Sequence, residues 1–152
     1  MIRNEHEYQE ALRRRAQDRH VFAAQKKAFV NAGFGPDEVA RGLEPLLSFQ
    51  AQLDEEIAWY ENVRRRNFPA IHRLTDIGQL LIAIRIAHGL TQRELADRLG
   101  VSEAVVSRDE RNEYHGITVE RAQRIFDALQ ESIVTTVDER SIESKPPLAG
   151  VV

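Results

Sequence analysis

The chain has 152 residues, 42% hydrophobic and 30% charged, which suits one ordinary domain or two small ones better than a single large catalytic core. It contains no cysteine, which excludes disulfides and thiolate zinc sites, and its five histidines lack close-paired ligand spacing, so we expect no metal and no cofactor. The net charge of -3 argues against a bulk polyanion binder, because sequence-independent affinity for nucleic acid requires clustered Lys and Arg.

The amino-terminal residues, from Met1 to Tyr8, are polar and lack the apolar stretch of a signal peptide. The longest strongly apolar run, Leu80 to Ile84, is far too short to cross a membrane. We therefore expect a soluble cytoplasmic protein with no membrane partner.

Residues 4 to about 66 are almost all helix formers, interrupted at 31–36 by two glycines and a proline. This pattern predicts a helical hairpin, whose second arm we expect to start near Glu44 with Pro45 in its first turn and to end at Asn67-Phe68-Pro69. One stripe of the second arm alternates spacings of four and three: Leu46, Gln50, Leu53, Ile57, Tyr60 and Arg64.

Residues 1–70 offer little core for a free-standing unit, because charged side chains interrupt the apolar stripe of the first arm. Apolar burial contributes roughly 25 cal/mol per Å² and must offset an ordering cost of about 1–2 kcal/mol per residue. Two interpretations stay open: a dimerising or partner-binding arm, or a solvated hairpin packed on the second domain. We expect residues 139–152 to form an irregular tail and assign them no function.

Residues 71–138 form the second predicted domain, in which helix starts and ends alternate closely. Residues suited to cap a helix, or to end one in the left-handed conformation, are Thr75 or Asp76, Gly89, Thr91, Gly100 and Ser102. Helices joined by such tight turns cannot enclose a catalytic pocket, but they can hold one helix out toward a DNA groove.

The run from Ile77 to Leu129 resembles the Cro/repressor type of helix-turn-helix, the XRE family. The residues that carry the resemblance are Leu90-Thr91-Gln92, Leu95-Ala96, Leu99-Gly100-Val101-Ser102, Val106-Ser107 and Glu110-Arg111. The resemblance implies an all-α protein in which the hairpin precedes a compact four- to five-helix lambda-repressor-like domain that binds double-stranded DNA.

The resemblance also assigns roles to single residues. Gln92 is implied to touch a phosphate and to brace the third helix, with Thr91, Arg93 and Ser102 beside it at the exposed helix starts. The residues implied to read or follow base edges in the major groove are Glu103, Ala104, Ser107 and Arg108. After the third helix, Tyr114 and His115 are expected to donate to phosphates.

Arg85 and Glu110 match family positions that form a structural ion pair between the first and third helices. Two residues depart from the family pattern: Asp109 replaces an aromatic or aliphatic residue, which puts the local packing in doubt, and Asn112 replaces a common glycine. Because Asn tolerates the left-handed conformation, we expect the turn at Asn112 to survive. We expect Arg121 to be solvated rather than directed at DNA.

An enzymatic function would have to use carboxylates such as Asp54, Glu55 and Glu56, but no nucleophile elbow, phosphate loop or paired metal ligands accompany them. We therefore expect that the protein is not an enzyme. The favoured hypothesis is a transcriptional repressor that binds a near-palindromic operator as a homodimer. The alternative is an antitoxin whose helical arm binds a toxin and which represses its own operon; an adaptor that has lost DNA binding is a third interpretation.

Overall fold

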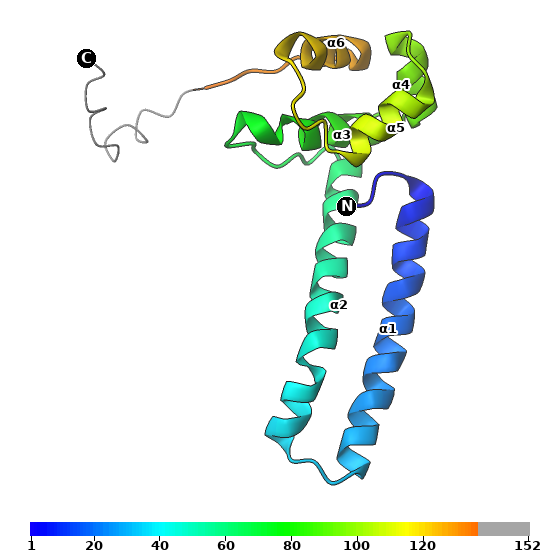
Figure 1. Cartoon of the computed structure of the whole chain (residues 1–152), viewed down its shortest axis with the longest axis vertical. Coiled ribbons are helices and arrows are strands. Elements are labelled where there is room, and N and C mark those ends of the chain that lie inside the picture. The colour runs from blue at the N-terminus through cyan, green and yellow to red at the C-terminus, as the bar shows by residue number, and fades with distance from the viewer. Residues whose placement is uncertain (137–152) are drawn as a thin grey trace, which may run out of the picture.

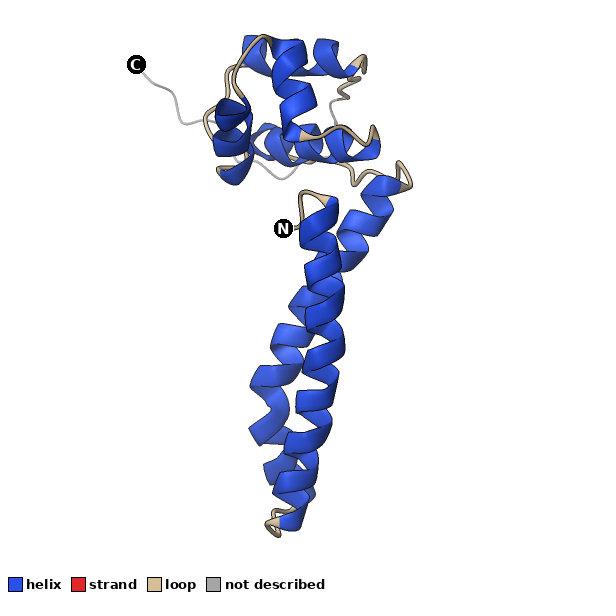
Figure 2. Ribbon diagram, turned by 90° about the vertical axis from the view of Figure 1, so that its right-hand side faces the viewer, coloured by secondary structure: helices blue, strands red, loops and turns tan. Residues whose placement is uncertain are grey.

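The computed structural model describes residues 1–136, and all regular secondary structure in this part of the chain is helical (Figure 1, Figure 2). The elements in chain order are α1 (Glu5–Asn31), α2 (Pro36–Arg64), the 3-10 turn η1 (Leu74–Asp76), α3 (Ile77–Ala87), α4 (Gln92–Leu99), α5 (Glu103–Arg111) and α6 (Val119–Leu129). The predicted all-α fold, a hairpin followed by a compact helical bundle, is confirmed. The expected irregular tail at 139–152 lies outside the described residues.

None of the helices that the structure describes is long and apolar enough to cross a membrane.

The hairpin consists of α1 and α2, which run side by side, with α2 reaching further toward the bundle (Figure 1). Asn4 caps α1 by accepting a hydrogen bond from the Glu7 backbone N–H at 2.9 Å. The start of α2 is defined by Pro36 in the first helical position and by the Glu38 carboxylate, which accepts from the Gly35 N–H at 2.8 Å.

The predicted start of the second arm near Glu44 is wrong, because α2 begins at Pro36 and Pro45 lies inside it. A proline within a helix removes one backbone hydrogen bond. The helix nevertheless continues on the amino-terminal side of Pro45, where Val39 and Leu43 are buried. Burial of these two side chains offsets the missing hydrogen bond.

The hairpin joins the bundle at the end where the chain begins (Figure 1). At this end Tyr8 stacks on Tyr60 with ring centroids 4.9 Å apart. Ile2, Ile57 and Val63 share one core with the bundle helices. The other end of the hairpin, the turn at 32–35, projects away from the bundle.

The bundle is built around α3, which is buried continuously from Leu81 to Ile86. Packing of α6 against α3, and of α4 against α5 and α6, closes one core, to which these helices contribute Leu95, Ala96, Val106, Ala122, Ile125, Phe126 and Leu129. Gly78 at the start of α3 allows a very close approach of the loop after α5, since a Cβ atom there would lie 1.9 Å from the Glu113 carbonyl oxygen. The core thus holds α4 and α5 in a defined orientation on α3.

Candidate nucleic-acid interface

The start of α4 is held by a reciprocal cap between Thr91 and Glu94. The Thr91 hydroxyl accepts from the Glu94 N–H at 3.1 Å, and the Glu94 carboxylate accepts from the Thr91 N–H at 2.7 Å. The hydrogen bonds that the Thr91 N–H and hydroxyl donate to the Glu94 carboxylate lower the pKa of that carboxyl. The carboxylate therefore stays ionised at the positive end of the helix dipole.

The turn from α4 to α5 runs through Gly100, which has the left-handed backbone (φ +68°) predicted for it. Ser102 occupies the N-cap position of α5, but its side chain makes no capping hydrogen bond. The prediction that the Ser102 hydroxyl caps the helix is therefore wrong. Ser102 is exposed at the amino-terminal end of α5.

A buried ion pair joins α3 to α5. The Arg85 and Glu110 side chains are only 2% and 0% exposed, and Arg85 donates to the Glu110 carboxylate from Nε at 2.5 Å and from Nη2 at 2.7 Å. Gln92 at the start of α4 donates from Nε2 to the same carboxylate at 2.8 Å. One carboxylate thus links the three helices α3, α4 and α5.

The Arg85 guanidinium also donates hydrogen bonds to two backbone carbonyl oxygens. Nη1 donates to the Leu90 oxygen at 2.6 Å and Nη2 to the Arg3 oxygen at 3.0 Å. Arg85 therefore fixes the chain before α1 and the turn before α4, in addition to α5. The predicted Arg85–Glu110 contact is present in the structure, and the contact to Arg3 could not be anticipated because it spans 82 residues of sequence.

The amino-terminal half of α5 presents one exposed face. Glu103, Ala104 and Arg108 are exposed and Ser107 is half-buried, whereas Val106 and Glu110 point into the core. The Arg108 side chain is 74% exposed, with Nε 4.0 Å from the Asp109 carboxylate. This spacing along a helix places the four predicted base-reading residues on one continuous face, which borders the side that carries Val106 and Glu110.

Residues at the start of α4 lie next to this face. Thr91 and Arg93 are exposed and Gln92 is half-buried. A hollow of about 390 Å³ separates these residues from the first turn of α1 and the last turn of α2, and its lining includes Arg3, Arg64, Gln92 and Glu103. Sequence reasoning missed Arg3 and Arg64, because only the packing of the hairpin on the bundle brings them here.

The loop after α5 differs from the prediction at two residues. Asn112 is not left-handed (φ -93°); Glu113 and Tyr114 adopt positive φ instead, at 49° and 52°. Tyr114 is 5% exposed and packs into the core, so the expectation that it donates to a phosphate is wrong. Burial raises the pKa of its hydroxyl, which forms no hydrogen bond with any described residue.

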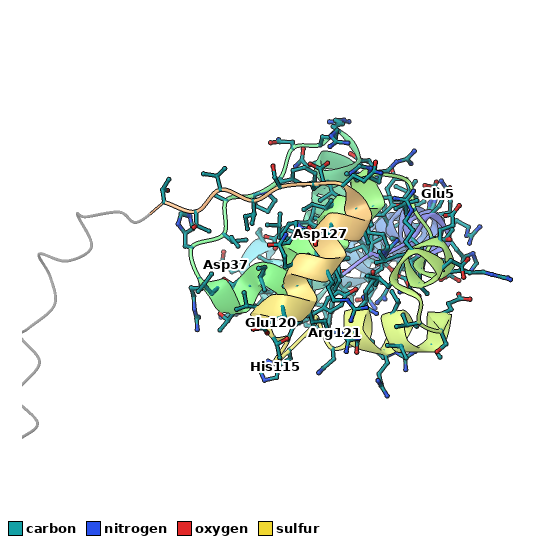
Figure 3. The ribbon with its side chains drawn as sticks, turned by 90° about the horizontal axis from the view of Figure 1, so that it is seen from above. Glu5, Asp37, His115, Glu120, Arg121 and Asp127 are labelled. Carbon is teal, nitrogen blue, oxygen red and sulfur yellow. The ribbon has the colours of Figure 1, made fainter. Side chains whose placement is uncertain are left out.

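His115 is exposed and points outward near the first turn of α6 (Figure 3). Asp109, which departs from the family pattern, forms an ion pair with Arg121, so the local packing accommodates a carboxylate there. The Arg121 side chain is 47% exposed, and its solvated rather than DNA-facing role stays a prediction.

The comparison with protein families supplies the decisive observation: residues 81–135, from within α3 to beyond α6, match the family model described as Helix-turn-helix. This part of the chain is a helix-turn-helix domain of the Cro/repressor type. The helix-turn-helix domain places the protein among DNA-binding transcription regulators, and its match leaves α1 and α2 outside. Comparisons with curated proteins and with solved structures return no match.

Proposed function

We propose that the protein is a sequence-specific transcriptional repressor that binds an operator as a dimer and places α5 in the major groove. The observation that carries this proposal is the geometry of α5. Its inner side is anchored through Glu110 to Arg85 and Gln92, while its amino-terminal outer face is exposed. A rigid helix with a free amino-terminal face suits the reading of base edges.

Each exposed side chain on α5 has a matching base edge. Glu103 can accept from the amino group of cytosine, Ala104 can contact a thymine methyl group, and Arg108 can donate to guanine O6 and N7. Ser107 is half-buried, and its hydroxyl can serve either a base or the backbone. These four residues would account for the choice of sequence.

Phosphate contacts would set the position of the helix on DNA. The Gln92 amide has two N–H donors, and one of them holds Glu110, which leaves the second for a phosphate. Thr91, Arg93 and Ser102 lie at the starts of α4 and α5, and His115 is exposed in the loop between α5 and α6. We assign these residues to positioning.

The low positive charge of the chain makes a dimer necessary for useful affinity. With a net charge of -3, few counterions would be released by one domain, so general affinity for DNA is weak. Two domains on half-sites about 34 Å apart would combine their contacts. We assign residues 1–70 to the dimerising or partner-binding arm and residues 71–138 to DNA binding.

The test is a gel-shift titration of the purified chain with DNA from upstream of its own gene, at several salt concentrations. Arg108→Ala should weaken specific binding by about 1–3 kcal/mol and relax the choice of one base pair, whereas Gln92→Ala should weaken binding to all sequences. Arg14→Ala, an exposed arginine of α1 outside the α4–α5 surface, is the matched control and should bind normally. Absence of any salt-sensitive shift would refute the proposal.

The repressor role needs a separate measurement. A reporter gene controlled by the bound DNA should be less active when the protein is present, and Arg108→Ala should restore its expression. An increase of expression by the wild-type protein would make it an activator and contradict repression.

A second candidate function, an antitoxin that blocks a protein partner through the hairpin, is favoured by the exposed apolar side chains near the hairpin turn, such as Val30, Phe34 and Phe49. Coexpression with the product of an adjacent small gene tests it. A stable complex that relieves growth arrest by that product would establish this function, and growth arrest unaffected by the chain would exclude it.

A further inference from the structure

We propose that the distal half of the hairpin, residues 19–50, is a docking face for the same face of a second copy of this chain. The two hairpins would form a four-helix bundle and point in the same direction. The partner is a second copy of the chain, because the apolar surface of this half can pack on the same surface of another copy. The basic α1 of each copy would then face the acidic α2 of the other. The common direction of the hairpins rests on the function proposed above.

The distal half exposes apolar surface that the proximal half does not. A groove between α1 and α2 of about 540 Å³ is lined by apolar side chains that include Val30, Phe34 and Leu47. These three are 57%, 47% and 48% exposed, and Phe49 on α2 is 63% exposed. Large apolar side chains gathered on one element mark an interaction surface.

Within its distal half, the hairpin buries few apolar side chains between its own two helices. Only Val39 and Leu43 are fully buried between residues 19 and 50, whereas Ile57, Tyr60 and Val63 near the bundle belong to the main core. Ordering each residue costs about 1–2 kcal/mol, which two helices with so few buried contacts do not offset well. A second hairpin would supply the missing apolar burial.

The charges point to a copy of the same chain. Within residues 19–50, α1 carries three Lys or Arg and no Asp or Glu, whereas α2 carries three Asp or Glu and one Arg. No ion pair joins these two stretches among the described residues, and the Arg15–Asp54 pair lies nearer the bundle. A second hairpin packed alongside would set the basic α1 of each copy against the acidic α2 of the other.

Two residues of opposite charge, one on each helix, border the groove. Lys26 of α1 lines it, and Glu44 of α2 lies between the lining residues Ala40 and Leu47 at helical spacing. Neither Lys26 nor Glu44 forms an ion pair with any described residue. In a two-fold symmetric dimer this pair would occur twice, Lys26 of one copy facing Glu44 of the other.

The orientation follows from the DNA. Both α5 helices must reach one duplex at half-sites about 34 Å apart. Hairpins that point the same way keep both helix-turn-helix domains at one end of the bundle. Hairpins that overlap in opposite directions would place the two domains at opposite ends.

Charge reversal in the full-length chain tests the interface, with sedimentation equilibrium as the measurement. The wild type should dimerise, and Lys26→Glu or Glu44→Lys alone should each raise the dissociation constant at least about tenfold, because each substitution creates two like-charge contacts. An equimolar mixture of the two variants should dimerise like the wild type, since each copy then meets opposite charge. Arg65→Glu, at the end of α2 away from the groove, is the control and should dimerise normally.

A monomeric wild type, or variants that fail to complement in the mixture, would overturn the interface. Binding of the monomer to a single half-site is measured separately and reports on the helix-turn-helix alone, so failure of the interface can be told apart from failure of DNA recognition by α5. The orientation is read from spin labels, since the chain has no cysteine and Asn31→Cys accepts one label near the hairpin turn. A short distance between the two labels supports hairpins that point the same way, and a distance near half the hairpin length refutes that orientation.

Discussion

Removal of the Glu110 carboxylate is the sharpest test of how the reading helix is held. Glu110→Leu keeps an apolar side chain of similar size but leaves the Arg85 guanidinium, 2% exposed, without its counter-charge. Two hydrogen bonds from Arg85 and one from Gln92 are lost at once. The Leu90 and Arg3 carbonyls still accept from Arg85, so the charge keeps part of its solvation.

The expected loss of unfolding free energy is about 3–5 kcal/mol, since breaking one side of a buried pair strands the other charge. The double variant Arg85→Met/Glu110→Leu should lose less than the sum of the two single variants, with a coupling energy of about 2–3 kcal/mol. Arg64→Ala, which breaks a pair with Glu5 between two half-exposed side chains, should cost at most about 1 kcal/mol.

Urea unfolding followed by far-UV circular dichroism measures the stability of all four variants, and a gel shift with operator DNA measures their DNA affinity. We expect Glu110→Leu to lose DNA affinity even where it is still folded, because Gln92 no longer braces α5. A cost below about 1 kcal/mol, or additive single and double variants, would refute the role of the pair as a coupled buried anchor.

Three further substitutions test the loop after α5 and the end of α6. Gly78→Ala should lower the unfolding free energy by about 1–3 kcal/mol despite the better helix propensity of Ala, because its Cβ would collide with the Glu113 carbonyl; a more stable variant would contradict this close approach. Tyr114→Phe should leave DNA affinity unchanged and keep or raise stability by about 1 kcal/mol, since the buried hydroxyl has no described partner; a loss of affinity would reinstate a phosphate contact. The hydrogen bond from His88 holds the pKa of the Glu131 carboxyl below its ordinary value of 4.5, so its contribution to stability is complete above about pH 4.5 and is lost as the pH falls through the lower folded pKa. The stability difference between wild type and Glu131→Gln should therefore shrink on acidification, and a difference that grows toward low pH would exclude this linkage.

The helix ends of the second domain could be predicted because each depends on a single residue and its immediate neighbours. Gly89 and Gly100 both adopt the left-handed backbone expected of them, and Thr91 caps α4. The Arg85–Glu110 contact was predicted from the resemblance to a family with specific residue spacing, and not from the residues next to each of them in the sequence. Prediction from neighbouring residues failed at Ser102, which occupies the N-cap position of α5 but makes no capping hydrogen bond with its side chain.

Two of the errors, at Pro45 and Tyr114, share one physical cause: tertiary packing overrode a local preference. Pro45 is tolerated inside α2 because Val39 and Leu43 before it are buried against α1. Tyr114 was assigned to the surface on its chemistry, but the close approach at Gly78 draws the loop onto α3 and turns the ring inward. Neither outcome can be read from neighbours in the sequence, because both depend on contacts between separate helices.

The same buried arginine connects the hairpin to the reading helix. Arg85 donates to the carbonyl of Arg3, just before α1, and to Glu110 at the inner side of α5. Because α2 also packs on α3, the direction in which the hairpin projects is tied to the direction in which α5 faces. If two hairpins pair as proposed, the spacing of the two reading helices is set by this rigid connection and not by a flexible linker, so a substitution that loosens Arg85 should broaden the range of half-site spacings that the dimer accepts.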